Sequence, residues 1–109
     1  MMAKKKQTIK VIRKKPGQDP EEIVIEKTIE ALEAEVGGKV KPYGYFREAQ
    51  FLCNHDWREL GLEPNFLFAG TRFYGTVLMV GITRNGTDFV DVQISAEAAK
   101  YFMIRSFYQ

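Results

Sequence analysis

Cysteine and histidine are almost absent from this 109-residue sequence, which contains one of each, Cys53 and His55. A single cysteine excludes a disulfide within the chain and is typical of a protein in a reducing compartment. A stable zinc site needs about three or four ligands, and the chain has no second cysteine or histidine to join these two. Because Cys53 alternates with Phe51 toward one side of an extended segment, we expect it to be buried and unreactive. We therefore predict neither a metal site nor a nucleophile–base pair.

Long apolar runs and catalytic motifs are also missing. No apolar stretch approaches the roughly 18 residues of a membrane span, and no apolar segment follows the basic N-terminus to form a secretory signal. We therefore expect a cytoplasmic protein with no membrane contact. Gly37-Gly38 lacks the downstream Gly-Lys-Ser/Thr pattern of a phosphate-binding loop and fits the end of a helix. Since no two acidic residues stand out as a catalytic pair, the sequence predicts a binding protein without a cofactor rather than an enzyme.

Charge is distributed unevenly along the chain. Residues 1–15 carry seven of the sixteen basic residues and no acidic residue. The remainder carries nine basic and all fourteen acidic residues, a net charge of −5. We expect residues 1–6 to form a disordered basic arm and residues 7–109 to form a single domain. The arm is either a solvated tail or a non-specific phosphate contact. Nucleic-acid binding beyond that contact is not expected, because the rest of the chain is acidic.

Hydrophobic patterning predicts an α+β domain, a mostly antiparallel sheet of hairpins with two helices packed on one face. Thr28 is suited to cap the first helix and Gly37 to end it. The most apolar stretch, Phe73–Thr83, is expected to form one central buried strand, and Asn85-Gly86 is a hairpin turn signal. The expected strands are residues 8–14, 22–27, 39–43, 45–53 (after a reversal near Pro42-Tyr43-Gly44), 66–68, 73–83 and 88–94, and the expected helices are residues 29–36 and about 96–105.

Several stretches together carry a family resemblance. They are Thr28–Leu32 with Val36–Gly38, Leu52–Asn54, Leu60–Asn65 and Gly75–Gly81. In order and spacing they resemble the domain of unknown function 3846 family, which comprises short phage and Gram-positive bacterial proteins. The resemblance covers roughly residues 9–102 and implies a bacterial host cell as the setting, but no activity. The sequence departs from the family pattern at residues 55–58 and in the aromatic stretch 66–74, so ligand choice is expected to be particular to this member.

The non-periodic segment Asn54–Asn65 is the most informative candidate site. Its two terminal asparagines either bind a ligand through their amides or close turns through the backbone. Trp57 beside Arg58 either forms a stacking platform for a base or fills the core beneath the loop.

Aromatic residues and arginines are interleaved in Arg72-Phe73-Tyr74 and in Tyr43 to Arg47. This mixture suits a nucleotide, because aromatic rings stack on bases and guanidinium groups bind phosphate. It also suits a subunit or partner interface, where tyrosine and arginine are enriched. The chain has eight Phe, five Tyr and one Trp, and a sheet with two helices cannot bury all of these rings. We therefore predict a homo-oligomer.

These observations lead to one main hypothesis for function. We expect a non-enzymatic, phage-type binding protein that sequesters a small nucleotide-like signal, a cyclic nucleotide or ADP-ribose derivative, to counter host defence. The alternative is a protein-interaction module that blocks a host protein. Nucleic-acid binding through the arm and an enzyme that degrades a nucleotide are further alternatives. The predicted ligand-binding residues are Arg47, Asn54, Trp57, Arg58, Asn65, Arg72 and Tyr74.

Overall fold

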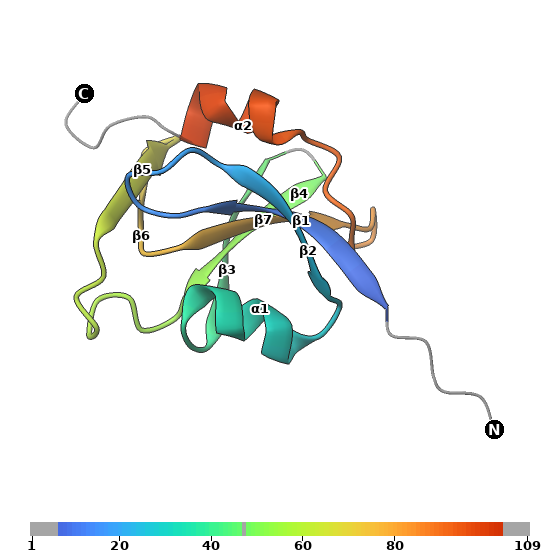
Figure 1. Cartoon of the computed structure of the whole chain (residues 1–109), viewed down its shortest axis with the longest axis horizontal. Helices are drawn as coiled ribbons and strands as arrows, with labels where there is room; N and C mark the ends of the chain where they lie inside the picture. The colour runs from blue at the N-terminus through green and yellow to red at the C-terminus, as the bar shows by residue number, and fades with distance from the viewer. Residues whose placement is uncertain (1–6, 47, 104–109) are drawn as a thin grey trace.

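The structure, a computed structural model, describes residues 7–46 and 48–103, apart from the side chains of residues 44–46. The described residues form eight strands and two helices (Figure 1), which confirms the predicted α+β class. The predicted basic arm, residues 1–6, lies outside the described residues. The elements are β1 (Thr8–Lys14), β2 (Glu21–Glu26), α1 (Ile29–Val36), β3 (Val40–Phe46), β4 (Ala49–Asn54), β5 (Pro64–Phe68), β6 (Thr71–Tyr74), β7 (Val77–Ile82), β8 (Phe89–Val90) and α2 (Ala96–Met103).

The main sheet has the strand order β2-β1-β7-β4-β3, and β8 pairs with β7 beside this row. Every pairing is antiparallel, which confirms the prediction of a mostly antiparallel sheet. β5 and β6 form a separate two-stranded ribbon. β1 and β8 share one edge of β7, with β1 opposite its first residues and β8 opposite Gly81 and Ile82. Gly81 permits this close pairing, because a Cβ there would lie 2.4 Å from the carbonyl oxygen of Asp91.

The two helices lie on opposite faces of the sheet, so the prediction that both cover one face is wrong (Figure 1). Buried side chains of α1 pack with one set of strand residues, which we call the α1-face core, and those of α2 pack with another, the α2-face core. The physical reason is that β4 and β7 are apolar on both sides, and each side must be covered. The α1-face core contains Leu32, Val36, Ile9, Val11, Leu52, Leu78 and Val80. The α2-face core contains Ala99, Met103, Ile12, Ala49, Phe51, Cys53, Phe66, Phe73, Val77, Met79 and Val92.

The prediction that the apolar stretch 73–83 forms one strand is wrong. It contains the end of β6 and the whole of β7, which belong to different sheets. The break is at Gly75, whose φ of 74° is in the left-handed region that favours glycine. A Cβ at Gly75 would lie 2.6 Å from Cδ1 of Leu62. Leu62 therefore occupies the space that a side chain at this position would need.

The chain reversal predicted near Pro42-Tyr43-Gly44 is also wrong. β3 continues through these residues, with a shift of register between Pro42 and Tyr45, and the chain turns only before Ala49. A local irregularity absorbs the glycine and proline without ending the strand. The α1 boundaries are confirmed: Oγ1 of Thr28 accepts a hydrogen bond from the Ala31 N–H, and Gly37 ends the helix with a φ of 79°.

Candidate functional site

Trp57 stacks on Tyr74 at the surface of the molecule. Trp57 follows β4 in the chain, and Tyr74 is the last residue of β6. Their ring centroids are 4.2 Å apart and their planes are within 3° of parallel. Cζ of Arg58 lies over the Trp57 ring, 5.1 Å from its centroid. We call these three residues the Trp57 stack.

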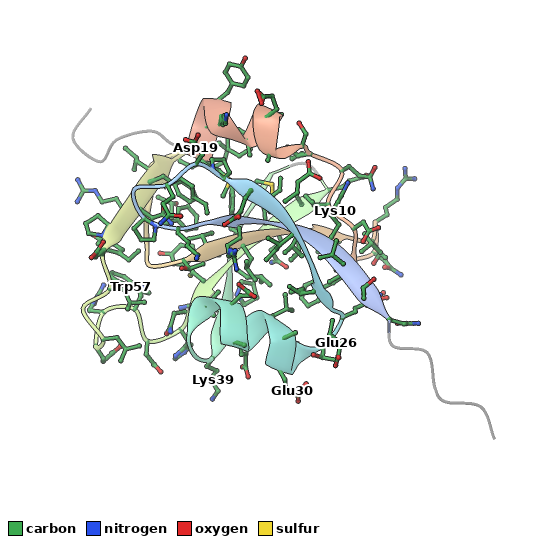
Figure 2. The ribbon with its side chains drawn as sticks, viewed as in Figure 1. Lys10, Asp19, Glu26, Glu30, Lys39 and Trp57 are labelled. Atoms are coloured by element: carbon green, nitrogen blue, oxygen red, sulfur yellow. The ribbon has the colours of Figure 1, made fainter. Side chains whose placement is uncertain are left out.

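The Trp57 stack remains partly open to solvent. Both rings are partly exposed and Arg58 is exposed, and Figure 2 shows Trp57 at one side of the molecule, on the loop that leads to β5. Trp57 belongs to neither core cluster among the described residues. Trp57 therefore does not fill the core beneath the loop, which was one of the two interpretations that the sequence left open.

Arg72 lies close to the Trp57 stack along β6. Alternation along the strand puts Arg72 and Tyr74 on one face, while Phe73 between them is buried in the α2-face core. Tyr43 packs edge-on against Phe73, with the ring centroids 5.6 Å apart. The predicted aromatic group is therefore divided, with Tyr43 on the core side and Arg72 and Tyr74 outside. Arg47, another predicted ligand-binding residue, lies outside the described residues.

Asn54 is a structural anchor for the segment that carries Trp57. Its side chain is 1% exposed. Nδ2 donates to the carbonyl oxygen of Val36 at 3.0 Å, and Oδ1 accepts from the Asp56 N–H at 2.7 Å. These bonds connect β4 to the end of α1 and start the turn that presents Trp57. These contacts fit the interpretation in which Asn54 closes a turn through the backbone.

Asn65 has a similar internal role. Nδ2 donates to the carbonyl oxygens of Lys14 and Gly75 at 2.8 and 2.7 Å, and Oδ1 accepts from Nζ of Lys14 at 2.9 Å. Nζ of Lys14, which is 3% exposed, also donates to the Lys15 carbonyl oxygen. Burial lowers the pKa of the Lys14 ammonium, and the charge of Asp19 partly opposes this shift. Asn65 thus joins β1, β5 and the β6–β7 junction.

The family model described as a domain of unknown function, DUF3846, matches residues 9–103. This match covers most of the chain. The protein belongs to the DUF3846 family. Comparison with curated proteins and with solved structures gave no match for this DUF3846 chain.

In this DUF3846 protein, Cys53 and His55 have different surroundings, since the first is buried and the second is exposed. Cys53 is 2% exposed, and burial raises the pKa of its thiol to about 11, with a smaller opposing effect of Lys41. Nδ1 of His55 lies 2.9 Å from Oδ1 of Asp56 on the surface. Residues 7–46 and 48–103 contain no group of three or more His, Cys, Asp or Glu residues placed to hold a metal ion. They also contain no helix that is long and apolar enough to cross a membrane.

Sequence reasoning missed one feature of this DUF3846 fold, a cavity beside α1 that is lined in part by Gln50. All six residues of β4 are buried, and Gln50 shares the face of β4 that carries Leu52. A glutamine on a core-facing side was the available signal. It is ambiguous without the structure, since a buried amide is usually paired within the protein.

Proposed function

We propose that this protein binds a small, planar, anionic ligand of the nucleotide type and holds it without chemical change. The observation that carries the proposal is the Trp57 stack, with Arg72 on the same face of β6 as Tyr74. A base adds about 1–3 kcal/mol of stacking free energy for each aromatic platform it contacts. Guanidinium groups beside that platform can bind phosphate oxygens in pairs.

The charges around the stack favour a compact ligand over a nucleic-acid duplex. Arg58 and Arg72 are both exposed, but the same segment carries Asp56, Glu59 and Glu63. Acidic side chains repel a long phosphate backbone, whereas a single nucleotide contacts only the few groups next to it. This charge pattern supports a cyclic nucleotide or an ADP-ribose derivative as the ligand class.

The proposed biological role is to sequester such a signal inside a bacterial cell. The short phage proteins of the resembled family supply the setting, and the role follows by analogy with proteins that remove nucleotide signals of host defence. Binding without chemistry needs only a preformed surface, and the Trp57 stack is preformed.

A homo-oligomer is part of the proposal. Tyr101 is 88% exposed, Val24 is 66% exposed and Leu60, close to Trp57 in the chain, is 57% exposed. Large apolar side chains in such positions are suited to contact with a second copy. The same exposure supports the second candidate function, a module that blocks a host protein. Pull-down from a host lysate separates the two, since a stoichiometric protein partner with no bound small molecule favours the second.

Titration of the protein with cyclic dinucleotides and cyclic ADP-ribose isomers tests the main proposal. Trp57 is the single tryptophan, so its fluorescence reports directly on stacking at the proposed site. We expect heat in calorimetry, quenching of Trp57, and recovery of the ligand intact afterwards. Absence of both heat and quenching with every ligand contradicts the proposal, and conversion of the ligand to a product contradicts its non-enzymatic part.

Variants locate the site. Replacing Arg58 and Arg72 together with alanine is expected to weaken binding by about tenfold or more for each lost guanidinium–phosphate contact. Arg84→Ala is the matched control, because Arg84 is an exposed arginine in the β7–β8 turn. Equal affinities of the double variant and the control contradict the assignment of the site to the Trp57 stack.

A further inference from the structure

A cavity of about 560 Å³ lies between the start of α1, the sheet and the β7–β8 hairpin. Its volume is within the range of about 300–1,000 Å³ that is typical of small-molecule sites. Most of its wall is apolar, with Ile9, Ile29, Leu32, Pro42, Ile82 and Phe89 among the lining residues. The cavity is on the α1 face and shares no lining residue with the Trp57 stack.

Gln50 lines this cavity with an amide that has no partner within the described part of the chain. Gln50 is 8% exposed, and no hydrogen bond joins its side chain to any described residue. Among the described residues, every side-chain nitrogen or oxygen that is fully enclosed has a hydrogen-bond partner. The amide atoms of Gln50 have none, so they are not fully enclosed. The amide therefore faces the open space of the cavity. Asn54 on the same strand differs, because its amide is hydrogen-bonded within the fold.

The charged residues of the cavity wall neutralise each other. Nζ of Lys27 lies 3.0 Å from Oδ2 of Asp88. The hydrogen bond from Lys27 lowers the pKa of the Asp88 carboxyl. Thr28 also lines the cavity, and its hydroxyl oxygen is occupied by the Ala31 N–H as the helix cap. The wall therefore favours an uncharged ligand over an anion.

We propose that the cavity binds a small, uncharged, planar molecule that presents a cis-amide or amidine edge to Gln50. The glutamine amide offers an acceptor oxygen and N–H donors in one plane. A lactam or an amidine offers the complementary donor and acceptor side by side, as adenine does to glutamine in nucleic-acid recognition. The apolar wall contacts the ring faces and excludes water. A free nucleobase and a lactam of another origin share this chemistry.

Titration followed by NMR of the ¹⁵N-labelled protein tests the proposal. The probes are adenine, uracil and 2-pyridone, and the control ligand is N-methyl-2-pyridone, which retains the ring and loses the N–H donor. At least one probe is expected to shift the side-chain NH₂ signals of Gln50 and to bind about tenfold or more tightly than its methylated counterpart or the control ligand. Preference for adenine and uracil indicates a nucleobase, and preference for 2-pyridone indicates another lactam.

Gln50→Leu replaces the amide by methyl groups and leaves an apolar side chain that is one atom shorter. It is expected to lower probe affinity about tenfold or more, whereas Gln93→Leu, at an exposed glutamine, leaves affinity unchanged. Equal binding of every probe and its N-methylated counterpart, or no shift of the Gln50 signals with any probe, overturns the proposal even if the variant fails to fold. The outcome is separate from that of the nucleotide site, because Trp57 fluorescence reports that site and Trp57→Ala leaves the cavity intact.

Discussion

The Trp57 stack and the Gln50 cavity differ in how their polar and aromatic groups are used. At the stack, Trp57, Tyr74 and Arg58 contact one another, and a ligand adds to contacts that exist already. In the cavity, Gln50 has no partner among the described residues, and in our proposal a ligand supplies its hydrogen bonds. A cluster of aromatic and arginine side chains at the surface and an amide with no partner in a cavity are therefore different kinds of evidence for binding. The second points more directly to a ligand, because the hydrogen-bonding groups of the Gln50 amide face the cavity and are not used within the described part of the fold.

The largest expected effect on stability is the difference between substitutions at the two amide side chains of β4, Asn54 and Gln50. Asn54→Ala leaves the Val36 carbonyl and the Asp56 N–H without their partner, so the free energy of unfolding is expected to fall by about 2–3 kcal/mol. Gln50→Leu removes an unpaired amide from an apolar wall and is expected to leave that free energy unchanged or raised. Urea denaturation measures both. A comparable loss in the two variants would show that Gln50 has a structural hydrogen bond.

Trp57 and His55 test whether the loop is held by its aromatic contact. Trp57→Ala removes the parallel contact with Tyr74 and is expected to lower the free energy of unfolding by about 1–2 kcal/mol and to abolish nucleotide binding. His55→Ala is expected to change stability by less than about 0.5 kcal/mol, because His55 is exposed. Thermal melts and calorimetry compare the two variants. Equal tolerance of both would reduce the Trp57 stack to a chance surface contact.

Lys14 is expected to make the free energy of unfolding change with pH in the alkaline range. Burial lowers the pKa of its ammonium in the folded state below the ordinary value of 10.5, so the unfolded chain binds the extra proton in that interval. The contribution of Lys14 to stability therefore rises as the pH increases through its folded pKa toward 10.5. Lys14→Met is expected to remove this rise. Denaturation of both proteins across that range provides the measurement, and identical pH profiles would contradict the assignment.

Cys53 is expected to have the smallest effect on stability near neutral pH. At alkaline pH, the change of its contribution with pH is opposite in direction to that of Lys14. Its thiol pKa is raised from 9.0 to about 11, so the folded state keeps the proton longer than the unfolded state. Its contribution to stability is lost as the pH rises from 9.0 through about 11. At neutral pH the native thiol should resist iodoacetamide and react only after unfolding. Rapid labelling of the native protein would show that Cys53 is accessible.

The sequence predicted the elements whose signals are local. Thr28 and Gly37 mark α1 at its two ends, and the alternation of Phe51 and Cys53 with Leu52 placed opposite faces of β4 correctly. The break at Gly75 was missed because glycine is compatible with a strand, and the conflict with Leu62 exists only after folding. The positions of the helices were missed because apolar strands require cover on both faces without specifying which helix supplies it.

The candidate site was predictable only where its residues are close together in the sequence. Trp57 and Arg58 are neighbours in the chain, and Tyr74 was predicted with them as a ligand-binding residue, but the stacking of Trp57 on Tyr74 was not predicted. The partners of Asn54 and Asn65 lie far away in the sequence, so nothing local distinguished an anchor from a ligand contact. The cavity at Gln50 is formed by segments that meet only in the folded sheet.

The hydrogen bonds of Asn65 have a consequence for the order of folding. They join the end of β1 and the β6–β7 junction across separations of 51 and 10 residues, so docking of the β5–β6 ribbon on β1 closes a long loop of chain. Closing so long a loop carries an entropic cost before its contacts form. We expect the ribbon to join the sheet after the folding transition state. Loss of the Asn65 amide should then accelerate unfolding more than it slows folding, and the ribbon that carries Tyr74 and Arg72 should be the first part to open under stress.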